Sequence, residues 1–88
     1  MKMIMCILQD SAKDKVVEAL YDKGFQVTVL PSTGGYFRKG NTTLLIGTDN
    51  DRVEEAITIM KKNSKRPEDP EAKRATVFVL NVNRHEQI

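Results

Sequence analysis

Two stretches of this chain are apolar on both faces of the strand that each would form, and this restricts the fold more than any other feature. Met1 to Gln9 is a nearly continuous run of Ile, Met and Leu, and Ala75 to Val82 is similar. Both runs are shorter than a typical stable helix, so they predict buried strands. Successive side chains of a strand face opposite sides, so each of these strands needs a cover on both sides. A chain of 88 residues has little material for two covering layers.

Hydrophobic spacing predicts two helices between these runs. Ser11 and Asp14 resemble a capping box at the start of the first helix, and Gly24 supplies a C-terminal stop. The second helix should begin after residues 48–51, which offer several N-cap side chains. Its inward face recurs at helical spacing, at Val53, Ala56, Ile57 and Met60.

Two further segments predict strands, and the order of all the elements gives the fold class. Phe25 to Leu30 alternates, and Thr42 to Gly47 follows a glycine-rich turn. Residues 63–73 carry two prolines and dense mixed charge, so they predict a solvated loop. The order βαββαβ matches the ferredoxin-like α+β plan, a four-stranded antiparallel sheet with two helices on one face. We expect one such domain over residues 1–88.

The second face of this sheet would have no cover from the chain itself. Large exposed apolar patches are uncommon in monomers, so a closed symmetric oligomer is the most economical cover. The alternative is an open and somewhat hydrophobic sheet face.

Charge and cysteine content narrow the functional classes. The 14 basic and 12 acidic residues give a net charge of +2 and are interleaved, which argues against a nucleic-acid surface. The sequence contains no apolar run of about 18 residues, so it predicts no membrane span. It also contains no signal-peptide core, and we therefore expect a cytoplasmic protein. The single cysteine, Cys6, lies within the first apolar run and predicts a buried thiol.

No group of side chains predicts catalysis or a metal site. His85 is the one histidine, and no soft metal ligand lies near it in sequence. A buried Cys6 would have a raised pKa and little reactivity. The acids of residues 49–55 lie at a helix start, where they are explained as partners of the helix dipole. We therefore expect a binding protein that is not an enzyme and carries neither a metal nor a cofactor.

The segment Thr33 to Thr43 offers the chemistry for binding a nucleotide. It combines three glycines, two aromatic rings, two cations and a side-chain amide. Backbone N–H groups at Gly34 and Gly35 suit a phosphate, a ring of the segment suits stacking on a base, and Asn41 suits an adenine edge. In a ferredoxin-like trimer this turn would project towards a neighbouring subunit, above a cleft walled by Thr28 and Gly47. The alternatives are a plain connection between strands, and rings that act as core or interface anchors.

Several blocks of the sequence, taken in order, carry a family resemblance. They are Met1-Lys2-Met3-Ile4, Gln9-Asp10, Thr33-Gly34-Gly35 through Arg38, Gly40-Asn41-Thr42-Thr43, Asp51-Arg52-Val53 and Ala75-Thr76-Val77-Phe78-Val79. In these blocks the chain resembles the PII-like cyclic di-AMP receptor proteins of Gram-positive bacteria. The resemblance implies a homotrimer that binds cyclic di-AMP, a bacterial second messenger, in clefts between subunits and signals to a regulatory protein target without catalysis. Carried onto this chain, the family's ligand-binding positions are Thr28, Gly35, Tyr36, Phe37, Asn41, Gly47 and, as a weaker match, Gln87.

The chain also departs from that family. Gln26 stands at a position that is often basic in the family, and Tyr36 stands where phenylalanine is common. The segment Ser64 to Lys73 is short, whereas family members carry a long loop that folds over the ligand. The truncated lid leaves a second hypothesis, a PII-like scaffold that acts as a protein-interaction trimer and binds no nucleotide.

Overall fold

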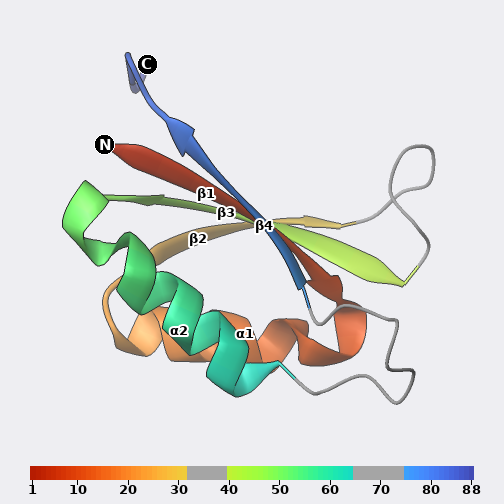
Figure 1. The fold of residues 1–88 in the computed structure, drawn as a ribbon. Coiled ribbons are helices and arrows are strands. Elements are labelled where there is room, and N and C mark those ends of the chain that lie inside the picture. The colour runs from red at the N-terminus through yellow and green to blue at the C-terminus, as the bar shows by residue number, and fades with distance from the viewer. Residues whose placement is uncertain (32–39, 65–74) are drawn as a thin grey trace.

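A computed structural model describes residues 1–31, 40–64 and 75–88. Its elements are β1 (Lys2–Gln9), α1 (Asp10–Asp22), β2 (Gln26–Pro31), β3 (Asn41–Thr48), the 3-10 turn η1 (Asn50–Arg52), α2 (Val53–Asn63) and β4 (Ala75–Asn81). The strands form one antiparallel sheet in the order β2-β3-β1-β4, and both helices lie on the same face of it (Figure 1). This arrangement confirms the predicted ferredoxin-like α+β fold.

The hydrophobic core lies between the sheet and the two helices. Alternate residues of β1 enter it, and both helices contribute one apolar face at helical spacing. The predicted inward face of α2 is confirmed, because three of its residues are buried and Ile57 is half-buried. The buried core side chains of β1 and the helices are Ile4, Cys6, Leu8, Ala12, Val16, Leu20, Val53, Ala56 and Met60.

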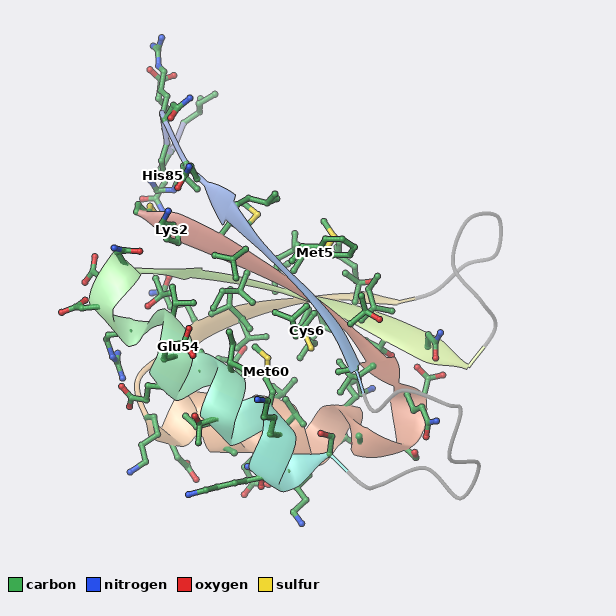
Figure 2. All side chains as sticks on the ribbon, viewed as in Figure 1. Lys2, Met5, Cys6, Glu54, Met60 and His85 are labelled. Atoms are coloured by element: carbon green, nitrogen blue, oxygen red, sulfur yellow. The ribbon has the colours of Figure 1, made fainter. Side chains whose placement is uncertain are left out.

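The other face of the sheet is also apolar around its central strand. Met5 lies opposite Leu45 of β3 and Phe78 of β4, so these three side chains share one face. Figure 2 shows Met5 on the opposite side of the sheet from Cys6, which points towards the helices. Phe78 and Leu80 keep 49% and 46% of their surface exposed. The prediction that β1 is apolar on both faces is confirmed, and the helices cover one of those faces.

The start of α1 differs from the prediction. The helix begins at Asp10, directly after β1, and its N-cap residue Gln9 makes no side-chain capping hydrogen bond. The predicted capping box at Ser11 is therefore wrong. The backbone N–H of Asp10 instead donates to the carbonyl of Gly40 at 2.8 Å, and the Thr42 hydroxyl donates to the Asp10 carboxylate. The Gly40 carbonyl thus takes the place of a local cap for this first N–H, and Thr42 binds the Asp10 side chain.

Burial makes Cys6 an inert thiol. Its side chain is fully buried, and this burial raises the pKa of the thiol to about 11, so it stays protonated at neutral pH. Among the described residues, no His, Cys, Asp and Glu side chains form a group that would hold a metal ion. The described helices are also too short or too polar to cross a membrane.

Candidate functional site

Four of the predicted ligand-binding residues lie in the described part of the chain, and the structure brings three of them, Thr28, Asn41 and Gly47, to one face of the sheet. Thr28 of β2 lies opposite Leu45 of β3. Asn41 and Gly47 are an even number of residues from Leu45 on the same strand, so they share its face. This is the face that the helices leave uncovered. Thr28 and Gly47 are exposed there, and Asn41 is half-buried.

These three residues do not meet at a single point. Gly47 lies opposite Gln26, next to Thr28 along that face of β2. Asn41 lies at the other end of β3, opposite Gln9. At about 3.3 Å per residue, Asn41 and Gly47 are about 20 Å apart along the strand. A ligand that contacts both must therefore extend along β3, or its site must be completed by another chain.

The fourth predicted residue that the structure describes is Gln87. Gln87 is exposed in the segment that follows β4. Because β4 ends at Asn81 beside the start of β1, Gln87 follows the end of the sheet that carries Gly47 (Figure 1). The predicted short loop before β4 lies outside the described residues, apart from Ser64. Also outside the described ranges are Gly35, Tyr36 and Phe37.

Gly47 borders a hollow of about 330 Å³ at this end of the sheet. A Cβ atom at position 47 would stand 3.0 Å from the terminal methyl of Met1. Glycine therefore leaves room between the strand and the N-terminal side chain. Gln26 offers a neutral amide beside it, at the position where the resembling family is often basic. The other residues that line the hollow are Gly24, Phe25, Thr48, Asp49 and Arg52.

Arg52 stands out in this lining, because sequence reasoning gave it no role of its own. Its guanidinium lies 4.1 Å from the centroid of the Phe25 ring and donates to the carbonyl of Lys23 at 2.8 Å. It also donates to both carboxylate oxygens of Glu55, each at 3.2 Å. This hydrogen bond raises the pKa of Arg52 and lowers the pKa of Glu55. Arg52 thus ties the start of α2 to the turn between α1 and β2, and its spacing from Glu55 was the available sequence signal.

Comparison with known proteins identifies the family of this chain. A family model described as the cyclic-di-AMP receptor matches residues 1–74, which include every element from β1 to α2. The chain belongs to the cyclic-di-AMP receptor family. Membership supports a signalling protein whose partner is a small nucleotide, and it favours binding over catalysis.

The fold of the receptor also resembles a solved structure. A protein from Pediococcus pentosaceus, described as functionally unknown, is 35% identical to this chain with a TM-score of 0.80. The match covers 99% of this chain and 96% of that one. This likeness supports the ferredoxin-like fold of the receptor and adds no functional assignment.

Proposed function

We propose that this receptor binds cyclic di-AMP in clefts between the subunits of a homotrimer and signals to a regulatory protein target without catalysing a reaction. The observation that carries the proposal is that Thr28, Asn41 and Gly47 share the sheet face that the helices leave uncovered. A ligand lying on that face of one chain would be open to solvent on its other side. Small-molecule sites are concave and enclose most of the ligand, so a neighbouring subunit would supply the second wall.

The apolar part of the same face supports an assembly. Phe78, Leu80 and Leu30 are 49%, 46% and 43% exposed, and the half-buried Met3 and Met5 lie on the same face. Burying apolar surface contributes about 25 cal/mol per Å², so a second chain would gain stability by covering these side chains. In a closed trimer each chain would meet two neighbours, and each boundary would form one cleft.

Each proposed site residue has a chemical role in such a cleft. The amide of Asn41 would donate to and accept from an adenine edge, and the hydroxyl of Thr28 would hydrogen-bond a polar group of the ligand. Gly47 would allow the ligand to approach the strand closely. Gly35 would donate a backbone N–H to phosphate, and Tyr36 or Phe37 would stack on a base. Gln87 would add a contact from the C-terminal segment.

Calorimetric titration of the purified receptor tests the ligand. Heat should accompany binding of cyclic di-AMP. Cyclic di-GMP, ATP and AMP are titrated in the same way as alternative ligands. Asn41→Ala should weaken binding by about fivefold to 100-fold, the range for removing one buried hydrogen-bond partner. Asn50→Ala, which removes the same side chain from η1, is the matched control and should leave the affinity unchanged. A trimer that takes up none of these nucleotides would refute the proposal and favour the protein-interaction scaffold.

Light scattering tests the assembly separately. Phe78 and Val79 are neighbours in β4 with 49% and 44% exposure, but Phe78 faces the uncovered side and Val79 the helix side. Phe78→Glu should convert the trimer to monomers, because it would bury a charge at the interface. Val79→Glu should leave the trimer intact. Equal behaviour of the two variants would show that this face is not the subunit interface.

A further inference from the structure

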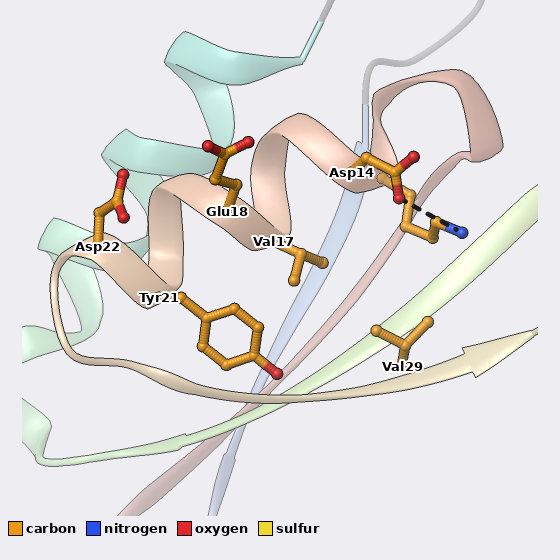
Figure 3. A pocket seen from close by; sticks show the side chains of 7 residues that line it. Asp14, Val17, Glu18, Tyr21, Asp22 and Val29 are labelled. Atoms are coloured by element: carbon orange, nitrogen blue, oxygen red, sulfur yellow. Dashed lines mark ion pairs between the residues drawn. The ribbon is translucent and has the colours of Figure 1, made fainter.

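A groove of about 460 Å³ lies between α1 and β2, on the helix side of the sheet and away from the proposed ligand face (Figure 3). Val17 of α1 and Val29 of β2 give it an apolar floor. Tyr21 closes one end, where its hydroxyl donates to the carbonyl of Val27 at 3.1 Å. Val29 is 38% exposed and Tyr21 is 55% exposed, so apolar surface in the groove faces solvent. The groove plays no part in the proposed binding of cyclic di-AMP.

The helix side of this groove is negatively charged. Asp14, Glu18 and Asp22 follow one another at intervals of four residues on α1, so they lie along one side of the helix. Lys13 is the cation in the lining, and its ammonium lies 3.6 Å from the Asp14 carboxylate. Three carboxylates and one ammonium give the groove a formal charge of −2, whereas the whole chain carries +2. The groove is therefore a local acidic site on a basic protein.

The strand beside the groove lies at the edge of the sheet. β2 pairs with β3 alone in the described sheet, so its other side offers backbone donors and acceptors, apart from the Val27 carbonyl, which already accepts from Tyr21. Charged residues and proline commonly protect such edges, and the sequence of β2, QVTVLP, has no charged residue and a proline only at its last position. An extended segment can add to an edge of this kind through main-chain hydrogen bonds, and neighbouring side-chain pockets then decide which segment fits.

We propose that this groove docks an extended basic segment of a partner protein, which adds to β2 as a further strand. The central side chain of that segment would be apolar and would lie between Val17 and Val29. The side chains two positions before and after it point to the same side of a strand. They would be Lys or Arg and would lie against the carboxylates of Glu18 and Asp22. A partner charge of +2 would match the −2 of the groove.

The probe for this proposal is the heptapeptide TKTVTRT with blocked ends, added to the ¹⁵N-labelled receptor in the absence of nucleotide. We expect saturable shifts of the amide signals of Val17, Tyr21 and Val29. Glu18→Lys should weaken peptide binding at least about fivefold, because it replaces an attraction by a repulsion. Glu54→Lys changes the net charge equally on α2, where Glu54 is exposed and outside the groove, and should weaken binding less than about twofold.

Two control peptides separate charge from strand addition. TETVTET should fail to bind, because its charge matches that of the groove. TKTPTRT should bind at least about tenfold more weakly, because proline removes a main-chain donor and disfavours strand pairing. Equal binding of either control, equal weakening by both lysine variants, or no saturable binding of TKTVTRT at millimolar concentration would overturn the proposal. Dilution-dependent shifts of Val17 and Val29 without peptide would do so too, since they would assign the groove to a second copy of the chain.

Discussion

Gly40, directly before β3, and Gly47, near the end of β3, should respond in opposite ways to the same substitution. Gly40 has a φ of +94° and open space around it, whereas Gly47 has no positive φ but lies close to Met1. An L-residue in the left-handed region costs about 1–2 kcal/mol, and replacing glycine returns about 0.4–1 kcal/mol by restricting the unfolded chain. Gly40→Ala should therefore lower the free energy of unfolding by about 1 kcal/mol.

Gly47→Ala meets an obstacle of a different kind. The new methyl would stand 3.0 Å from the Cε atom of Met1, which is the far end of a flexible side chain that is 56% exposed. Met1 can move at small cost, so the free energy of unfolding should change by less than about 0.5 kcal/mol. The same methyl points to the uncovered face, where it should weaken cyclic di-AMP binding at least about tenfold if Gly47 contacts the ligand.

Urea unfolding at a fixed protein concentration, paired with calorimetry, measures both effects. The expected pattern is a less stable Gly40→Ala, and a Gly47→Ala that is as stable as the wild type but binds poorly. A decrease of more than about 2 kcal/mol in the free energy of unfolding of Gly47→Ala would show that the Met1 side chain cannot move aside. Unchanged affinity in Gly47→Ala would remove this residue from the proposed site, and unchanged stability in Gly40→Ala would contradict the strain argument.

Further predictions concern three residues, Cys6, Glu55 and Thr42. The thiol of Cys6, whose pKa burial raises from 9.0 to about 11, should react with a disulfide reagent at about pH 8 far more slowly than after unfolding. Because the folded state then holds the proton more tightly, the free energy of unfolding should fall as pH rises above 9.0, and Cys6→Ala should abolish that slope. The hydrogen bond from Arg52 lowers the pKa of Glu55 below 4.5, so its contribution is present at neutral pH and lost on acidification; the stabilities of wild type and Glu55→Gln should converge at low pH. Thr42→Val should cost about 1 kcal/mol in urea unfolding, because it removes the hydroxyl that donates to Asp10, and a neutral result would make that contact dispensable.

The sequence predicted the elements and the class of the fold because those depend on spacing within short segments. The inward face of α2 needs only the 3.6-residue period, and the two apolar faces of β1 need only the two-residue period. The helix starts were harder to predict, because the partners of their first backbone N–H groups are distant in sequence or belong to the backbone. The first donor of α1 is met by the carbonyl of Gly40, and α2 is entered through η1, in which the N–H of Arg52 donates to the carbonyl of Asp49 at 3.0 Å. Local cap patterns cannot reveal partners of this kind.

The candidate site was predicted less completely for a similar reason. Family resemblance named Thr28, Asn41 and Gly47, but their relative positions depend on the register between β2 and β3. A shift of one residue in that register would have moved Thr28 to the other face relative to Gly47. Strand register follows from the whole sheet and its connections, so motif spacing alone could not give it. The same limit applies to Arg52, whose contacts with Phe25 and Lys23 join segments that are far apart in the sequence.

The uncovered face is not uniform, and this bears on where a ligand would lie. Its half near β4 is apolar, with Phe78 and Leu80 exposed beside β1. Near the start of β2 it is polar, with Gln26 and Thr28 exposed beside Gly47. Exposed apolar side chains gain most from a cover, whereas exposed polar ones lose hydration if they are buried without partners. An assembly that covers the β4 half first would leave the polar half at its boundary, next to the neighbouring chain. Of the proposed site residues, Thr28 and Gly47 lie in that polar half, whereas Asn41 lies at the other end of β3. The gradient of polarity therefore supports the proposed trimer and a nucleotide cleft that extends along β3 at the boundary between subunits.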